Sequence, residues 1–313
     1  MTPFALSPWF LRGAAFAFGL LWGSFLNVVI YRVPRDMSVV RPGSHCPGCG
    51  MPVEPYDNIP LVSFAILGGK ARCCGAKMSW RYPLVELVGG LLSLAAMEHV
   101  MRMPPAGAEW RFFVVYLAET ALCLGLTAAA FIDWEHMILP DSITLGGAVV
   151  GLATAPLRGQ PILDAAVSGA VAFGAIWFVF NVLYKKLRGR TGMGMGDAKL
   201  LAMAGAWFGW KGAVFVLVAG AVQGTIGSLV WRLVAGRIEM PEAVREEVAE
   251  LRRMAEEGDE EAIKALEDDP AAEEHDDFLQ AAIPFGPFLI MGCLEYLFGG
   301  HMVAPLVTKW LLP

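Results

Sequence analysis

Charged side chains are scarce in this sequence. Asp, Glu, Lys and Arg make up 17% of the 313 residues, whereas hydrophobic residues make up 56%. Soluble domains usually contain about 25% charged residues, so the composition excludes an ordinary soluble domain of this length. We therefore expect a membrane protein.

Cysteine is also rare, and its distribution is against a disulfide scaffold. Two of the six cysteines, Cys123 and Cys293, lie inside apolar runs, where they are expected to pack as small hydrophobic residues. The other four lie in one polar segment. Disulfide-rich secreted domains contain many more cysteines for their length, so these four are considered below as metal ligands.

A cleavage site of small residues is missing from the first apolar stretch, which opens with Pro8-Trp9-Phe10-Leu11-Arg12. A secretory signal peptide ends in such a site. Further apolar stretches follow, so we expect the first one to be a retained transmembrane helix.

Eight apolar segments are candidates for transmembrane helices, because a helix needs about 20 apolar residues to cross the hydrocarbon core. The fourth and the sixth are the shortest. The sequence thus predicts an all-α polytopic membrane protein with about eight transmembrane helices. The segments lie near residues 9–31, 83–101, 110–132, 142–157, 162–184, 198–212, 213–235 and 282–300.

Lys and Arg residues indicate the orientation of these helices. They are concentrated in residues 32–82 and 185–190, and short loops rich in Lys and Arg remain in the cytoplasm. With eight spans, this orientation places Asp133 and Asp197 on the same, cytoplasmic side of the membrane.

Residues 237–280 are strongly acidic, with 17 acidic and 5 basic side chains. The formal net charge of −6 is therefore local, and the rest of the chain is basic. Glu-rich helix formers interrupted by Gly258 and Pro270 predict one or two solvated helices. We call this segment the acidic insert, which is suited to attracting a basic peptide or to holding a cytoplasmic partner.

The segments divide the chain into five expected parts. These are a first transmembrane helix (1–31), a cytoplasmic Cys-containing loop (32–82), a membrane core (83–236), the acidic insert (237–280) and a C-terminal transmembrane segment (281–313).

Two aspartates lie where predicted transmembrane helices enter the interface. Asp133 ends an apolar run, and Asp197 ends the glycine-rich segment 192–197 just before another apolar run. A carboxylate at the edge of the hydrocarbon is costly and usually faces water or another polar group. Two aspartates hydrolyse a peptide bond when one ionised carboxylate takes a proton from water and its protonated partner polarises the carbonyl. We expect Asp133 and Asp197 to form such a catalytic pair.

Asp141 is the rival for the first catalytic position. It follows Pro140 and precedes Ser142-Ile143-Thr144, a setting suited to capping the next helix, so we favour Asp133 and interpret Asp141 as structural. Lys199, two residues after Asp197, is placed to bias the ionisation of the pair. A lysine at the end of a span more commonly extends to the interface, and we favour that interpretation.

Four segments resemble the type IV prepilin peptidases. Gly194-Met195-Gly196-Asp197 matches the G-x-G-D signature of membrane aspartyl proteases, and its continuation Ala198-Lys199-Leu200 is similar to the prepilin peptidase form. The other three are Gly23-Ser24-Phe25-Leu26-Asn27-Val28-Val29, Asp133 with Leu139-Pro140-Asp141, and Ile283-Pro284-Phe285-Gly286-Pro287-Phe288.

Residues 32–82 and the start of the next span resemble the cytoplasmic loop of the bifunctional bacterial members of that family. The similar segments are Cys46-Pro47-Gly48-Cys49, Tyr56-Asp57-Asn58-Ile59-Pro60 and Arg81-Tyr82-Pro83-Leu84-Val85-Glu86. The resemblance therefore covers nearly the whole chain except the acidic insert, and it implies that the Cys-containing loop is associated with methyl transfer.

The resemblance implies that Asp133 and Asp197 cut a basic leader from prepilins or pseudopilins after a glycine. It further implies that the new amino terminus is N-methylated from S-adenosylmethionine. No glycine-rich loop of the Rossmann type follows a predicted strand, so this methyl donor is implied by the resemblance alone.

Cys46, Cys49, Cys73 and Cys74 offer four thiolates to a tetrahedral structural zinc ion. The sequence departs from the family here, because Ala71 stands where the second pair has its first cysteine, and Cys73 directly precedes Cys74. Cys46, Cys49 and Cys74 are the firmer candidates, and the fourth ligand is Cys73 or another group. The alternative is two pairs of reduced thiols in a loop.

The sequence places this protein in the bacterial inner membrane, with multiple spans, lipid contacts, a cytoplasmic active site and no nucleic acid partner. Two alternatives stay open. One is a peptidase that has lost methyl transfer, suggested by the altered second cysteine pair. The other is a proton-coupled transporter, because paired intramembrane carboxylates also suit proton relays.

Overall fold

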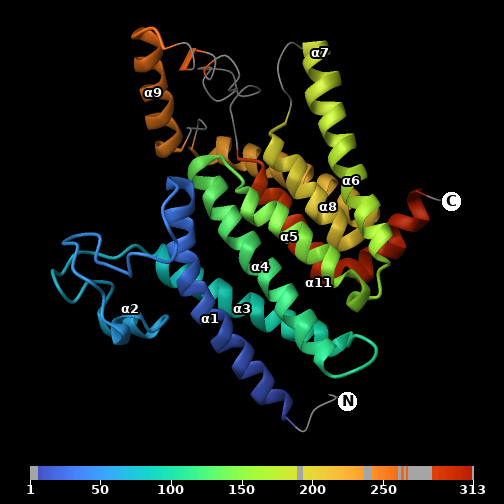
Figure 1. The fold of residues 1–313 in the computed structure, drawn as a ribbon, viewed down its shortest axis with the longest axis horizontal. Coiled ribbons are helices and arrows are strands. Elements are labelled where there is room, and N and C mark those ends of the chain that lie inside the picture. Colours follow the sequence, from blue (N-terminus) through green and yellow to red (C-terminus); the bar gives the residue numbers. More distant parts are fainter. Residues whose placement is uncertain are drawn as a thin grey trace. The chain divides into compact units, whose positions relative to one another are not determined.

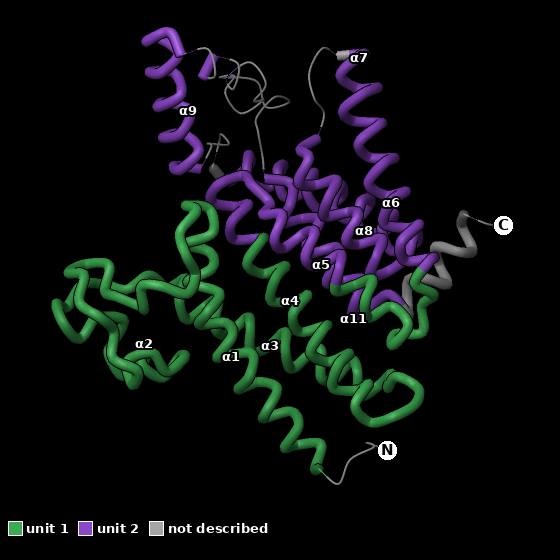
Figure 2. Tube along the Cα trace, in the orientation of Figure 1, with its two compact units in different colours: residues 1–129, 150–162 green, residues 130–149, 163–313 purple. Residues whose placement is uncertain are grey.

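The computed structural model describes residues 6–188, 193–235, 241–259, 262, 263, 266 and 284–311. These residues form helices and two isolated β-bridges, so the expected all-helical fold is confirmed. Figure 1 shows the helices, and Figure 2 colours two compact units: residues 1–129 with 150–162 (unit 1), and residues 130–149 with 163–313 (unit 2).

Unit 1 contains two helices in close contact, α1 (Pro8–Arg32) and α3 (Arg81–Arg102). A Cβ atom added to Gly89 would lie 2.7 Å from the Gly19 carbonyl oxygen, and one added to Gly23 would lie 2.8 Å from the Glu86 Cα. Small residues allow the backbones of membrane helices to approach this closely. Because Gly19 faces Gly89 and Gly23 faces Glu86, the two helices run antiparallel.

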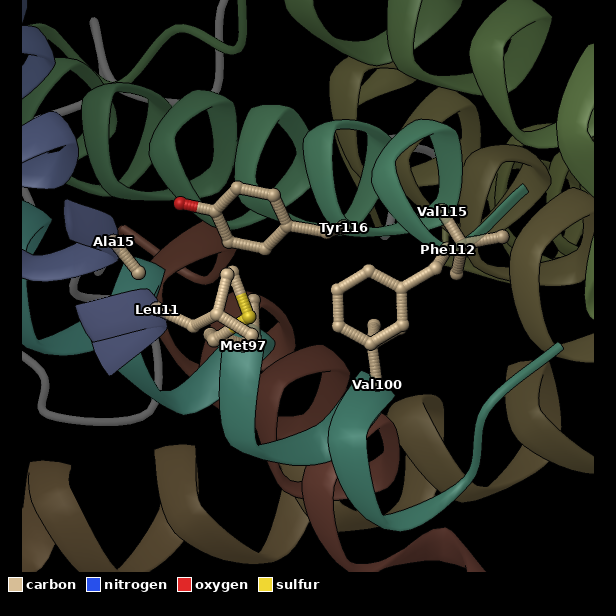
Figure 3. Packing of buried hydrophobic residues seen from close by; sticks show 8 residues of the cluster. Leu11, Ala15, Met97, Val100, Phe112, Val115 and Tyr116 are labelled. Carbon is tan, nitrogen blue, oxygen red and sulfur yellow. The ribbon is translucent and has the colours of Figure 1, made fainter. Parts of the chain in front are cut away.

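The core of unit 1 lies between α1, α3 and the first part of α4 (Trp110–His136). The Ser93 hydroxyl donates a hydrogen bond to the Ala15 carbonyl oxygen and is also bonded to the Tyr116 hydroxyl, both at 2.8 Å. These bonds satisfy polar groups that would be costly if left unpaired in an apolar core. The cluster, shown in Figure 3, comprises Leu11, Ala15, Ala96, Met97, Val100, Phe112, Val115 and Tyr116.

The segment between α1 and α3 is a compact loop with three short helical turns, η1 (Val33–Arg35), η2 (Pro55–Asn58) and α2 (Val62–Ile66). The Leu61 amide donates a hydrogen bond of 2.8 Å to Glu86 Oε2 on α3. This contact attaches the loop to the first turns of α3.

Unit 2 is centred on α8 (Met195–Ala235), which packs against several other helices. Against α11 (Gly286–Leu311), a Cβ on Gly220 would lie 2.7 Å from Leu289. Against α6 (Ile162–Trp177), a Cβ on Gly205 would lie 2.6 Å from the Ser168 carbonyl oxygen. Against α5 (Asp141–Thr154), the Trp207 indole donates a hydrogen bond of 2.8 Å to the Gly147 carbonyl oxygen.

Five helices in the described part of the chain are long and apolar enough to cross a membrane, so the expectation of a multi-pass membrane protein is confirmed. They are Pro8–Arg35, Arg81–Arg102, Trp110–His136, Ile162–Leu187 and Met195–Val234. The fourth runs on from α6 through the π-helical turn η4 (Phe178–Leu183) into α7 (Tyr184–Arg188).

The expected number of eight spans is not confirmed. The predicted fourth span corresponds to α5, which has only 14 residues and is followed by the turn η3 (Ala155–Arg158). The predicted sixth and seventh spans both fall within α8, whose only non-helical residue is Gly209 (φ 70°, ψ −178°). Hydropathy separates apolar runs, but it does not show where a helix continues beyond a break.

The acidic insert contains α9 (Glu242–Glu256), with Val244 and Val248 buried on one side and its glutamates on the others. Pro270 and most of residues 260–283, including Ile283, lie outside the described residues, as do Arg190, Gly192 and Arg237.

Candidate active site and metal centre

Asp133 lies in the last turn of α4 and is 5% exposed. The backbone amide of Gly286, the first residue of α11, donates a hydrogen bond of 3.0 Å to Asp133 Oδ2. A Cβ added to Gly286 would lie 2.6 Å from the same oxygen. Glycine is therefore required at position 286 for the start of α11 to approach this carboxylate.

Asp197 lies in the first turn of α8, where the free backbone amides of a helix favour a negative charge. A Cβ added to Gly194 would lie 3.5 Å from Asp197 Oδ2. Asp197 also interacts electrostatically with Asp133. The structure thus brings together the two aspartates that the sequence predicts as a pair, although 63 residues separate them in the chain.

Leu139 packs between the backbones that carry the two aspartates. A Cβ on Gly196 would lie 3.0 Å from the Leu139 Cβ, and a Cβ on Gly286 would lie 3.1 Å from Leu139 Cδ2. Gly196 directly precedes Asp197, and Gly286 binds Asp133. Neither Leu139 nor Gly286 is predicted from the sequence to contact the aspartates. The sequence does carry a signal for Gly286, because it is a glycine followed by a proline at the start of an apolar helix.

Asp141, the rival candidate, lies at the start of α5 and is 57% exposed at its side chain. It accepts a hydrogen bond of 2.6 Å from Lys199 Nζ in the first turn of α8. The expected interfacial lysine is thus an ion-pair partner of Asp141. The pair links the segment after Asp133 to the helix that begins with Asp197.

The four loop cysteines form one cluster in unit 1. Their sulfur atoms all lie within 4.8 Å of one another, with Cys46 Sγ 3.6 Å from Cys74 Sγ and Cys49 Sγ 3.3 Å from Cys73 Sγ. Zinc–sulfur bonds of about 2.3 Å in a tetrahedron place sulfur atoms about 3.8 Å apart. The donor set and its dimensions therefore fit a zinc ion, and Cys73 is in place as the fourth ligand.

Two similar turns present these cysteines. In the first, the Gly50 amide donates to the Cys46 carbonyl oxygen at 2.9 Å, next to the β-bridge of His45 with Pro52. In the second, the Gly75 amide donates to the Ala71 carbonyl oxygen at 2.8 Å, next to the β-bridge of Lys70 with Lys77. Ala71 thus occupies the place of Cys46, and Cys73 occupies that of Gly48.

The turns also influence the ionisation of the thiols. Backbone amides of Gly48 and Cys49 donate to Cys46 and lower its pKa to about 6. The hydrogen bond with Cys49, followed by that with Cys46, raises the pKa of Cys73 to about 12. A bound metal ion would displace the protons that remain on these thiols.

This protein is a polytopic membrane protein with an aspartate-pair site. The two carboxylates, Asp133 and Asp197, lie at the ends of apolar helices. Residues 120–229, with both aspartates, match the type IV leader peptidase family, and residues 17–100, with the four cysteines, match the bacterial peptidase A24 N-terminal domain. The chain belongs to the type IV leader peptidase family.

Three curated relatives carry the name prepilin leader peptidase/N-methyltransferase. The protein of Myxococcus xanthus is 41% identical over 71% of this chain and 63% of its own length. The protein of Neisseria gonorrhoeae is 37% identical over 74% of this chain and 86% of its own length, and that of Pseudomonas aeruginosa is 39% identical over 69% and 79%. No solved structure matches this chain.

Proposed function

We propose that this protein is a prepilin peptidase that removes the basic leader of type IV prepilins or pseudopilins after a glycine and then N-methylates the new amino terminus. Asp133 and Asp197 form its catalytic pair. The observation that carries this assignment is the approach of Gly196, next to Asp197, and Gly286, which binds Asp133, to the same side chain, Leu139 of unit 2.

The reaction needs one proton shared between the two carboxylates. The ionised carboxylate takes a proton from a water molecule, and the oxygen of that water forms a bond to the scissile carbonyl carbon. The protonated carboxylate donates its proton to the carbonyl oxygen as the tetrahedral intermediate forms. On collapse of the intermediate the C–N bond breaks and the leaving nitrogen takes the proton that the first carboxylate removed from water. A hydroxyl of the intermediate returns its proton to the second carboxylate, so the pair again holds one proton.

The scissile bond of the substrate and the two aspartates are expected at the same depth, at the membrane interface. Lys and Arg side chains concentrate in residues 32–82 and 185–190, which supports a cytoplasmic position of the site in the inner membrane. A basic leader is attracted to the anionic cytoplasmic leaflet while the adjoining apolar helix lies in the bilayer. Glycine at the cut lowers the cost of unwinding the helix before the carbonyl is attacked.

Cys46, Cys49, Cys73 and Cys74 would hold a structural zinc ion that cross-links the two turns of the Cys-containing loop. S-adenosylmethionine would supply the methyl group. The described residues form no sheet with a glycine-rich loop after a strand, so we assign no residue to the methyl donor.

The test is cleavage of purified prepilins and pseudopilins in detergent, with mass spectrometry of the mature amino terminus. Asp133→Asn and Asp197→Asn are each expected to abolish cleavage, since either change removes the shared proton. Asp141→Asn is the matched control at the rival position and is expected to retain cleavage. Survival of cleavage in either catalytic variant would refute the assignment.

The same experiment separates the alternatives. A peptidase without methyl transfer would release a mature protein with an unmodified terminus. A proton-coupled transporter would release no leader and would show proton-driven flux in liposomes. The client that is cut most efficiently identifies the substrate among pilins and pseudopilins.

A further inference from the structure

Met137 forms the turn that ends the helix carrying Asp133. Its backbone is left-handed, with φ of 55°, and its amide donates a hydrogen bond of 2.8 Å to the Asp133 carbonyl oxygen. Left-handed backbone is unfavourable for a residue with a side chain. The turn is therefore formed at a cost that contacts elsewhere must offset.

The compensating contact comes from the acidic insert. Val244 and Val248 of α9 are 6% and 5% exposed, and the Met137 side chain packs against them together with Leu266. The two valines are four residues apart and so lie on one side of the helix. Glu246, Glu247 and Glu250 are exposed. The helix α9 therefore has a narrow apolar side, and that side covers Met137.

The α9 side of this contact lies outside the part of the chain that matches the family, whereas Met137 lies inside it. The match to the leader peptidase family ends at residue 229, and α9 begins at Glu242. The acidic insert thus contacts the segment between Asp133 and Leu139 from outside the matched residues.

We propose that α9 is a positioning element of the peptidase, which holds the left-handed turn at Met137 and thereby fixes Asp133 relative to Asp197. The inference rests on the proposed function, because it assumes that Asp133 is catalytic. Burial of Val244 and Val248 against Met137 stabilises a backbone conformation that Met137 would otherwise leave. Release of α9 frees the last turn of α4, and the catalytic carboxylate loses its alignment.

The competing role for α9 is recruitment of the basic leader by its exposed glutamates. The two roles differ in kinetics. Positioning affects the chemical step and therefore kcat, whereas recruitment affects substrate binding and therefore KM. They also depend on opposite sides of the helix.

The experiment measures kcat and KM for prepilin cleavage by the full-length protein in detergent. Val248→Asp places a charge in the contact with Met137 and is expected to lower kcat about tenfold with KM within about twofold, since small displacements of reacting groups are costly. Val248→Ala, which weakens the contact without adding a charge, is expected to lower kcat less. The matched control is Glu247→Gln with Glu250→Gln, which changes the exposed side and is expected to leave kcat unchanged.

Rescue distinguishes positioning from general damage to the fold. Glycine adopts left-handed backbone without a steric cost, so Met137→Gly in the Val248→Asp protein is expected to restore most of kcat. An unchanged kcat in Val248→Asp, a rise in KM alone, or a loss that Met137→Gly does not restore would each overturn the inference. Failure of the proposed function gives a different result, which is no cleavage by the wild-type protein.

Discussion

Gly286 shapes the surroundings of Asp133 because it has no side chain. Its amide reaches Asp133 Oδ2 at 3.0 Å, and its hydrogen atom occupies the space that any Cβ would need. Leu139 lies close to both glycines, because a Cβ added to either Gly286 or Gly196 would meet its side chain. At this scale the site consists of two acidic side chains and the glycines that permit other backbones to approach them.

Gly286→Ala is therefore expected to lower kcat for leader cleavage about 100-fold, because the added methyl group displaces α11 or the carboxylate by about an ångström. Cleavage assays on the purified variant measure the loss. Gly146→Ala on α5 is the matched control, since a Cβ there meets nothing within 4 Å. Equal activity of the two variants would show that the approach of Gly286 is unimportant.

Helix ends bring the aspartates together. Asp133 is in the last turn of α4, Asp197 is in the first turn of α8, and Asp141 and Gly286 begin α5 and α11. Helix ends have free backbone groups and bend more readily than helix middles. The ion pair of Asp141 with Lys199 joins two of these ends directly.

Reversal of either charge in this pair is expected to lower kcat/KM about threefold, because an exposed ion pair contributes less than about 1 kcal/mol. The double variant Asp141→Lys with Lys199→Asp is expected to recover activity, since it restores the attraction between α5 and α8. Measurement of kcat/KM for the two single variants and the double variant gives the coupling energy between positions 141 and 199. Purely additive losses would contradict an ion pair that orients the helix of Asp197.

The two turns of the Cys-containing loop are also elements of this scale. Their backbone geometry determines where the cysteine sulfur atoms lie. Cys73 occupies the place of Gly48, and Ala71 that of Cys46, yet the Cys73 sulfur reaches the cluster. A thiol that reaches the cluster thus stands two positions later in the second turn than Cys46 does in the first.

Cys73→Ala is expected to lower the zinc content of the purified protein, because three thiolates bind zinc less tightly than four. Adding Ala71→Cys to that variant is expected to restore one zinc ion per chain, since position 71 is equivalent to position 46. Elemental analysis gives the ratio. Metal is also expected to be released as the pH falls, because protons compete with zinc for thiolates.

At the scale of the whole molecule, the cysteine cluster and the aspartate pair fall in different compact units. The cysteine cluster belongs to unit 1, and the aspartate pair belongs to unit 2. The two family matches divide the chain at about the same place, with residues 17–100 in one and residues 120–229 in the other.

Removal of zinc by a chelator is therefore expected to abolish N-methylation while leader cleavage changes by less than about twofold, because structural zinc sites stabilise their own domain. Mass spectrometry of the released amino terminus measures both activities in one sample. Loss of cleavage in parallel with methylation would show that the units depend on each other.

Much of this molecule is predictable from its sequence, because its main features depend on local patterns. Apolar runs predicted the membrane helices, and two costly carboxylates predicted the pair Asp133 and Asp197. The count of eight spans is not confirmed in the described residues, because α5 is short and because α8 contains two predicted spans. The contacts of Gly286 and Met137 were not predictable, since each depends on a segment more than 100 residues away in the chain.

The break at Gly209 has a consequence for how α8 fits into a lipid bilayer. A straight helix of 41 residues would be about 60 Å long at 1.5 Å per residue, which is about twice the thickness of the hydrocarbon core. The interruption allows the two pieces to lie at different tilts, so neither has to protrude far into water.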